Sequence, residues 1–315
     1  MDLRTPCRSV MNILTVVGPT ASGKTAYALE RALELDGEII SVDSRQIYRG
    51  FVIGTGQPTP EEQAQVPHHL VNFLDPSEKI TAGRYAGLVY ERIADIKARG
   101  KEPILCGGTG LYVRAIRLGL ASLGDSDPQL RRKIQARIEY EGAEAVYAAF
   151  AEIDPDYAAT FHHHNVRRLT RALEILHSTG QPPSRVQAWR KGEGGYAETP
   201  TITVEGAGEV TFELVGLERP RGELYSRINR RVQEMIDRGW LAEVRQLLAA
   251  DVSPEAHPMQ GVGYRELVQV VQDELAMDEA IPIIQQRTRR FARRQVIWFR
   301  REPVKWVTPT DATGA

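Results

Sequence analysis

Short apolar runs alternate with longer stretches over the first third of the chain. The runs at 12–17, 39–42 and 103–106 have the length of buried strands, and each ends in a glycine-rich or polar turn. Of the stretches between them, 26–35 permits a helix and 82–98 carries apolar residues at helical spacing. Continuous apolar runs are typical of parallel strands that are covered on both faces. The pattern predicts an α/β fold, a parallel sheet core flanked by helices.

From Asp125 to about Gly195 this alternation stops and helical periodicity takes over. The change predicts an inserted all-helical subdomain that ends in a glycine-rich linker at 192–195. Two strands, at 199–204 and 210–216, then return the chain to the sheet. Four helices and a last short strand are expected after them, at 224–238, 241–250, 264–271, 278–301 and 304–307. The expected division is a core at 10–124 plus 196–308, the inserted subdomain at 125–195, and loose tails at 1–9 and 309–315.

The arginines are unevenly distributed although the net charge is only −1. Seven of them lie between Arg287 and Arg301, with no acidic residue among them. Such a cluster predicts a surface that faces a polyanion, because solvated helix faces usually interleave the two signs of charge. A merely solvated helix face is the alternative. Aromatic residues in the same stretch suit nucleic-acid contact, but at helical spacing they are more often part of the core.

Composition limits the location of the protein. No apolar run approaches the roughly 20 residues that span a bilayer, so no membrane partner is expected. The two cysteines, Cys7 and Cys106, lie far apart, and Cys106 falls inside an apolar run. The sequence therefore predicts no disulfide and a reducing, cytoplasmic location.

One motif is more specific than this general pattern. The sequence GPTASGKT follows the first strand and has the G-x-x-x-x-G-K-[ST] form of a phosphate-binding loop, which makes the predicted core a P-loop, kinase-like sheet. Glycines let consecutive N–H groups point inward, and the following helix presents its positive N-terminal end to an anion. Lys24 adds a mobile cation, and the Thr25 hydroxyl is placed to bind Mg²⁺; a glycine-rich turn without a ligand is the weaker alternative. The predicted diphosphate-binding residues of this loop are Gly18, Pro19, Thr20, Ala21, Ser22, Gly23, Lys24 and Thr25.

Two further turns follow predicted strands. Asp43 comes after the strand at 39–42, and ligands of open α/β sheets collect at this edge, so Asp43 and the phosphate loop are expected to face one crevice. The turn that contains Thr109 has glycines and a hydroxyl, which suits close approach to a ligand, with a plain turn as an equal alternative. Its strand lacks the terminal Asp that organises the metal in ATP-hydrolysing motors, which argues against such a motor. Asp75 is a weak candidate for that acid, because a proline follows it at once.

Three consecutive histidines, His162 to His164, invite comparison with a metal site. Consecutive side chains diverge on a helix or a strand, and no other Cys or His lies at ligand spacing. We therefore expect no metal at this position.

These residues allow two classes of enzyme. One is a P-loop kinase that acts on a small molecule, with Asp43 as the base for an acceptor hydroxyl. The other binds a pyrophosphate ester together with a nucleic acid. The basic helix and the basic insertion favour the second class without deciding it.

Motifs along nearly the whole chain resemble one known family. Besides the phosphate loop they are Asp43-Ser44, Gly54-Thr55, GGTGLY at 107–112, RLTRALE at 168–174, GVGY at 261–264, and Thr288-Arg289 through Arg293-Arg294-Gln295. Together they resemble the tRNA isopentenyltransferase family, the tRNA dimethylallyltransferases, over about 12–301. The resemblance implies transfer of a dimethylallyl group from dimethylallyl diphosphate to N6 of adenosine 37, next to the anticodon, in tRNAs that read codons starting with U.

The resemblance also implies roles for individual residues. Asp43 is the expected base, Thr109 would reach the bridging oxygen of the diphosphate, and Lys24 with Arg231 would meet its charge. Mg²⁺ on Thr25 is the expected cofactor, and the anticodon stem-loop of tRNA is the expected partner of a monomer. Many family members have Lys where this chain has Gln57, which puts a phosphate contact from that loop in doubt. The implied tRNA contacts are Asp43, Ser44, Arg45, Gln46, Thr109, Arg131, Arg167, Arg168, Leu169, Thr170, Arg171, Met259, Gln260, Gly261, Val262, Gly263, Tyr264, Thr288, Arg289, Arg290, Arg293, Arg294 and Gln295.

Overall fold

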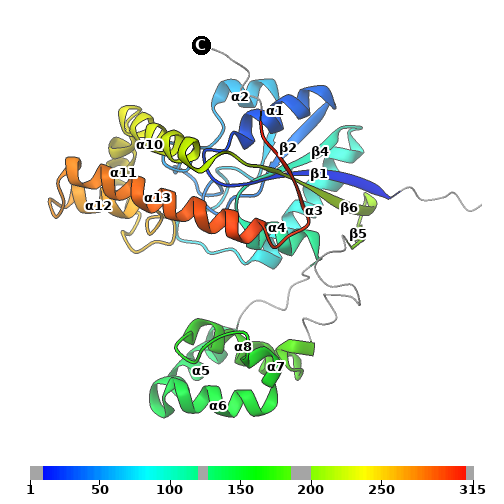
Figure 1. Ribbon diagram of the computed structural model, residues 1–315, viewed down its shortest axis with the longest axis vertical. Coiled ribbons are helices and arrows are strands. Elements are labelled where there is room, and N and C mark those ends of the chain that lie inside the picture. Colours follow the sequence, from blue (N-terminus) through cyan, green and yellow to red (C-terminus); the bar gives the residue numbers. More distant parts are fainter. Residues whose placement is uncertain (1–9, 120–126, 186–199, 310–315) are drawn as a thin grey trace, which may run out of the picture. The chain divides into compact units, whose positions relative to one another are not determined.

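The structure is a computed structural model that describes residues 10–119, 127–185 and 200–309 (Figure 1). The chain divides into two compact units, one formed by Met1–Gly119 with Thr199–Ala315 and the other by Leu120–Glu198. The boundaries predicted at 124/125 and 195/196, the glycine-rich linker, and the predicted tails at 1–9 and 309–315, apart from Pro309, lie outside the described residues.

Seven strands of the described chain form one sheet in the first unit (Figure 1). Their order is β3-β2-β4-β1-β6-β5, with β7 beside β6, and every pairing is parallel except that of β5 with β6. The predicted α/β class with a mostly parallel core is therefore confirmed. The strands are β1 (Met11–Val17), β2 (Gly37–Ser41), β3 (His68–His69), β4 (Glu102–Cys106), β5 (Ile202–Val204), β6 (Gly208–Leu217) and β7 (Val304–Val307).

Helices of the same unit cover both faces of this sheet (Figure 1). On one face Ala28 and Ala32 of α1 pack against Val16, Ile39 and Ile104 of the central strands. The chain then reverses its direction across the sheet, and because crossovers between parallel strands are right-handed, α3 covers the opposite face. The helices are α1 (Lys24–Glu34), α2 (Pro60–Gln65), α3 (Ala82–Ala98), α4 (Gly110–Arg117), α10 (Arg221–Asp237), α11 (Trp240–Ala249), α12 (Tyr264–Val271) and α13 (Met277–Phe299).

Two segments differ from the sequence prediction. The apolar pattern predicts no helix at 60–65, yet α2 forms there, because Thr59 and Glu62 make a capping box in which each side chain accepts the other's N–H, at 3.2 and 2.8 Å. The segment 68–75 is apolar enough to predict a strand, yet it contributes only the two-residue β3 to the sheet. Positive φ angles of 59° at Leu70 and 54° at Asn72 end the strand there.

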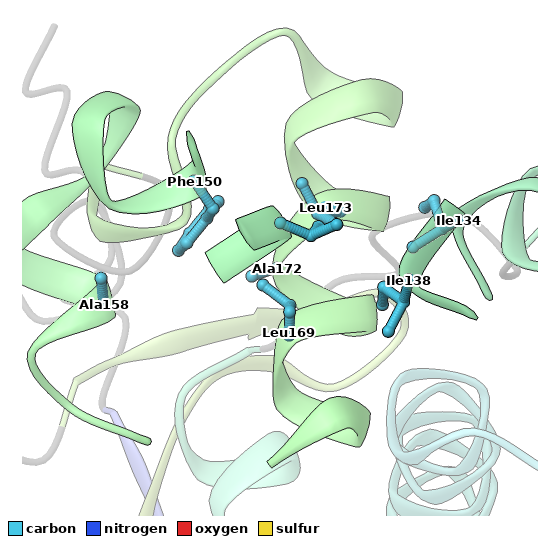
Figure 2. Close-up of a cluster of buried hydrophobic side chains, with 8 residues drawn as sticks. Ile134, Ile138, Phe150, Ala158, Leu169, Ala172 and Leu173 are labelled. Carbon is cyan, nitrogen blue, oxygen red and sulfur yellow. The ribbon is translucent and has the colours of Figure 1, made fainter. Parts of the chain in front are cut away.

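The second unit is helical where the structure describes it. Its core gathers buried side chains that include Ile134 and Ile138 of α5, Phe150 of α6, and Leu169 and Leu173 of α8 (Figure 2). These are the apolar positions that helical periodicity singles out between Asp125 and Gly195. None of the helices described in either unit is both long and apolar enough to cross a membrane. The helices of this unit are α5 (Pro128–Glu141), α6 (Ala143–Ile153), α7 (Pro155–Ala158) and α8 (Val166–Thr179).

A buried ion cluster attaches the C-terminal end of α13 to α4. Glu302, just beyond α13, accepts a hydrogen bond from Nη2 of Arg117 at 2.8 Å, and both side chains are only 1% exposed. Glu302 also accepts from Nε of Arg114 at 2.7 Å, and the Arg114 guanidinium lies 4.5 Å from the centre of the Trp298 ring in α13. Charges removed from water in this way are tolerated only while they are paired, so the cluster fixes the position of the helix end.

Replacing Glu302 with Gln is expected to lower the free energy of unfolding by about 3 kcal/mol, because it removes the carboxylate that compensates the buried Arg117 charge. Glu34→Gln is the control, since it removes an exposed partner of Arg31 and is expected to cost less than about 0.5 kcal/mol. Urea unfolding followed by circular dichroism measures both variants. Equal stability of the two would show that Glu302 does not hold this junction.

Candidate functional site

The phosphate loop connects β1 to α1 at the carboxyl edge of the sheet. Its residues Gly18, Ala21 and Gly23 have positive φ angles of 137°, 63° and 101°, which curl the backbone. Glycine is required at the first of these positions, because a Cβ atom on Gly18 would lie 2.8 Å from the carbonyl oxygen of Leu217 in β6. The helix α1 begins at Lys24 without a side-chain cap, so the N–H groups of its first turn stay available to an anion.

Two arginines from outside the loop bind its carbonyl groups. Nε of Arg227 donates to the carbonyl of Ala21 at 3.0 Å, and Nε of Arg219 donates to that of Ser22 at 3.1 Å. Each contact fixes the direction of a carbonyl and adds positive charge beside the loop. Neither arginine belongs to a motif of the sequence; the signal for Arg219 is its place two residues beyond β6, at the same edge of the sheet.

Asp43 and Thr109 meet at this edge, as expected for Asp43 from the end of its strand. Oδ1 of Asp43 accepts the N–H of Arg45 at 2.7 Å and that of Gln46 at 3.4 Å, which leaves Oδ2 outside these bonds. Oγ1 of Thr109 accepts the N–H of Ser44 at 3.0 Å and lies 3.3 Å from the Ser44 hydroxyl. The turn after β2 is thus bonded to the turn after β4. The Thr109 hydroxyl binds Ser44, the residue that follows the Asp43 carboxylate.

Lys24 is the buried cation of the phosphate loop. Its Nζ donates to the Pro19 carbonyl at 2.6 Å. Burial lowers the pKa of Lys24 to about 8, against the opposing effect of Cys106 and Asp43, and Arg231 lowers it further. Asp43 and Arg231 are both near enough to Lys24 to shift its pKa, in opposite directions. An ammonium group that has lost its water gains strongly from an anion that takes the place of the solvent.

A small cavity of about 20 Å³ opens beside Thr25, with room for about one water molecule. Ser41, Gln46 and His68 line it as well. Nδ1 of His68 lies 2.8 Å from the Val66 carbonyl oxygen and therefore carries the proton, while Nε2 is buried with no hydrogen-bond partner among the described residues. The Thr25 hydroxyl is an oxygen donor of the kind that Mg²⁺ binds, but this cavity has no room for the several water ligands that the ion usually keeps.

The loop at 52–57 is held by a carboxylate that the sequence did not reveal. Glu243 in α11 accepts the N–H groups of three consecutive residues and the hydroxyl of Tyr264, the latter at 2.6 Å. In the sequence, Glu243 cannot be distinguished from the acidic residues that occupy the exposed face of an amphipathic helix. Arg231 packs on the same loop, because a Cβ atom on Gly56 would lie 2.0 Å from its Nη2. Gln57 turns inward and donates to the Gln46 carbonyl at 2.8 Å, so it stabilises the loop.

Two segments that were predicted separately to contact tRNA line one surface cavity of about 280 Å³. One is the segment before α12 and the other is the arginine face of α13. The cavity holds four guanidinium groups and one carboxylate, that of Glu266, which is paired with Arg287. Such an excess of positive charge attracts phosphate groups. Its lining residues are Gln260, Gly261, Val262, Arg265, Glu266, Arg287, Arg290 and Arg294.

The other predicted tRNA contacts of this unit differ in their exposure. Arg290, Arg293 and Arg294 are exposed along α13. Arg289 and Thr288 are already engaged, with Asn229 at 2.6 Å and the Ile284 carbonyl at 2.7 Å. Gln46 binds the Gly56 carbonyl at 2.8 Å, and Arg45 binds the His257 carbonyl. The side chains of three others, Met259, Tyr264 and Gln295, are buried. In this conformation, buried side chains assist tRNA binding only through the segments they support.

The predicted contacts of the helical unit lie on α5 and α8. Arg131 and Arg171 both bind the buried Glu174, at 3.2 and 3.0 Å, while Arg167 and Arg168 are exposed. Leu169 and Thr170 are buried, at 0% and 1% exposed, so they hold α8 in place.

The three histidines before α8 lie close together. Their donor atoms are all within 4.8 Å of one another. The prediction that these side chains diverge is wrong, because His162 to His164 lie in a turn and belong to neither a helix nor a strand. The adjacent Arg167 and Arg168 make this part of the surface unfavourable for a cation.

Comparisons with known proteins agree on one family. A family model described as IPP transferase matches residues 46–302. The tRNA dimethylallyltransferase 1 of Trichlorobacter lovleyi is 44% identical over 94% of this chain and 93% of its own, and the tRNA dimethylallyltransferase of Anaeromyxobacter dehalogenans is 42% identical over 95% of each. The crystal structure of the full-length tRNA isopentenylpyrophosphate transferase of Bacillus halodurans is similar with a TM-score of 0.65 and 35% identity, and covers 95% of this chain and 90% of that one. A eukaryotic dimethylallyltransferase acting on tRNA reaches a TM-score of 0.80 at 27% identity, with 96% of this chain and 74% of that one covered.

Inorganic diphosphate is expected to bind this loop more weakly as the pH rises above about 8, where Lys24 is neutral in the free protein. Binding must then supply a proton to Lys24, so the affinity should fall by up to about tenfold per pH unit. Lys24→Arg stays charged and should lose this component, while the titration of the ligand itself affects both proteins alike. Calorimetric titrations from neutral to alkaline pH measure the difference. Identical pH profiles would contradict the lowered pKa.

Proposed function

The chain belongs to the IPP transferase family, and from this premise we propose that it transfers the dimethylallyl group of dimethylallyl diphosphate to N6 of adenosine 37 in tRNA. The products are N6-(dimethylallyl)adenosine and diphosphate, and the substrates are tRNAs that read codons starting with U. The observation that carries the proposal is that one unit presents both a phosphate loop and an arginine-lined cavity. A kinase for a small molecule needs the first of these and not the second.

The proposed chemistry begins with a weak nucleophile. The exocyclic amine of adenine has its lone pair delocalised into the ring, so it needs a base as it attacks the allylic carbon. In this step the new bond forms between N6 and that carbon, the carbon–oxygen bond to diphosphate breaks, and a proton leaves N6. Asp43 suits the base, because the turn holds Oδ1 through the N–H of Arg45 and leaves Oδ2 to accept the proton.

The leaving diphosphate develops negative charge that positive groups must already be placed to meet. The N–H groups of the first turn of α1, the ammonium of Lys24 and the guanidinium of Arg231 serve this purpose. Thr109, whose Oγ1 accepts the N–H of Ser44, would reach the bridging oxygen. Thr25 would hold Mg²⁺ through its hydroxyl, and the ion supplies further positive charge to the leaving group.

The adenine reaches the site only if it leaves the stack of the anticodon loop. Phosphate contacts can hold the RNA while this happens, since they position a nucleic acid without reading its bases. We assign them to Arg290, Arg293 and Arg294 on α13 and, in the helical unit, to Arg167 and Arg168. One unit contains both the phosphate loop and the basic cavity, which supports a monomer as the active form, and tRNA as substrate supports a cytoplasmic location.

Incubation of radiolabelled dimethylallyl diphosphate with unmodified tRNA tests this function. Label should enter the tRNA, and Asp43→Asn should slow the transfer by about 10²- to 10⁴-fold without weakening tRNA binding. ATP offered with hydroxyl acceptors is the control for a kinase. Phosphorylated acceptor with unlabelled tRNA would reject the transferase, whereas undiminished transfer by Asp43→Asn would reject only the role of the base.

Replacing both Arg290 and Arg294 with Ala is expected to weaken tRNA binding and to reduce the slope of log affinity against log salt by roughly two, one for each lost phosphate contact. Arg31→Ala, at an exposed ion pair on α1, should leave the slope unchanged. Fluorescence anisotropy with a labelled anticodon stem-loop at a series of salt concentrations measures it. A slope equal to that of the wild type would mean that these arginines form only a solvated face.

A further inference from the structure

Gln295 is a polar residue on a buried position of the arginine helix. It lies next to the exposed Arg294, yet its own side chain is only 7% exposed. The carboxamide bridges two loops that are far apart in the sequence. Oε1 accepts the N–H of Thr20 in the phosphate loop at 2.8 Å, and Nε2 donates to the carbonyl of Gly108 in the turn after β4 at 3.0 Å.

The helix α13 is fitted closely onto that turn. A Cβ atom on Gly108 would lie 2.3 Å from Nε2 of Gln295, so only glycine admits the amide. One turn further along α13, Trp298 covers Gly110 in the same manner, since a Cβ atom there would lie 2.2 Å from its indole ring. The helix α13 therefore contacts the residues immediately before and after Thr109.

Both loops that Gln295 bridges carry groups for the diphosphate. The phosphate loop contributes Lys24 and the first N–H groups of α1, and Thr109 follows directly after Gly108. The bridge also gives partners to the half-buried N–H of Thr20 and the buried carbonyl of Gly108, and such groups cost free energy when they are removed from water without a partner. Because the residue is only 7% exposed and makes one accepted and one donated hydrogen bond inside the protein, its carboxamide is directed at the two loops and not at an RNA surface.

We propose that Gln295 is a positioning residue for the diphosphate site, which holds the phosphate loop and the Thr109 turn at a fixed separation, and is not an RNA contact. This inference rests on the proposed function. A planar amide offers an acceptor and a donor at the two points where the loops need them. Glutamate would retain the acceptor but has no hydrogen for the Gly108 carbonyl, and methionine has a similar size but neither group.

Gln295→Met is the decisive variant, and Gln285→Met is its matched control. Gln285 lies ten residues earlier on α13, about 15 Å along the helix, and its Nε2 donates to the Asn229 carbonyl at 3.2 Å. Calorimetry with inorganic diphosphate and anisotropy with a labelled anticodon stem-loop give the two affinities. We expect Gln295→Met to weaken diphosphate binding by roughly tenfold, as one lost hydrogen bond in a buried site would, and to change RNA affinity by less than about twofold. The control should change neither.

The outcomes distinguish a positioning residue from an RNA contact, and they distinguish a failure of this inference from a failure of the proposed function. Weakened RNA binding with normal diphosphate binding would overturn the proposal and make Gln295 an RNA contact, as would normal affinity for both ligands. If Gln295→Met fails to fold by circular dichroism, Gln295→Glu takes its place; it keeps the Thr20 bond and should still lose diphosphate affinity, and normal affinity would again overturn the proposal. If the wild-type protein binds neither ligand, the proposed function itself fails.

Discussion

A backbone loop that turns its N–H groups toward an anion must find partners for its remaining polar groups, and this requirement organises the core. The partners come from distant elements. Arg219 follows β6, Arg227 lies on α10 and Gln295 lies on α13, and these bind the Ser22 carbonyl, the Ala21 carbonyl and the Thr20 N–H. The N-terminal loop therefore takes its shape from the C-terminal third of the chain, which explains why α10 and α13 belong to the same compact unit as β1.

The same arrangement collects positive charge before any ligand arrives. Arg219, which is paired with Glu223, and Arg227 bind the phosphate loop, Arg231 acts on Lys24 with a like charge, and burial lowers the pKa of Lys24. Such a site holds its charges at a cost in stability, since burial and mutual repulsion both disfavour them. The cost fits a reaction in which the anion leaves from carbon, because groups fixed in advance stabilise a developing charge without rearranging during the step.

Local patterns predicted the parts of the molecule whose cause is local. Buried parallel strands need continuous apolar runs, and the phosphate loop needs its glycines and Lys24, so both could be found in the sequence. The functions of Glu243 and Gln295 depend on partners about 190 and 275 residues away, for which a single sequence has no signal. One clue existed for Gln295: Ala292, Gln295 and Phe299 share the buried stripe of α13, and a polar residue on such a stripe needs a partner inside the protein. The expectation that the side chains of His162 to His164 diverge is wrong because it holds for a helix or a strand, and neither forms at these residues.

The helix α13 carries residues for both halves of the proposed function. Its exposed face carries Arg290, Arg293 and Arg294, its buried face carries Gln295, and its end is fixed by the Glu302 ion cluster. RNA that binds the exposed arginines cannot displace the helix without breaking a buried charge pair, so the phosphate contacts act on a fixed frame. The distance from the RNA backbone to the phosphate loop is then set by side-chain packing within α13 and its neighbours. A reaction that joins a base to a carbon held by diphosphate depends on that distance, because misplacement of the reacting atoms by about 1 Å can cost a hundredfold in rate.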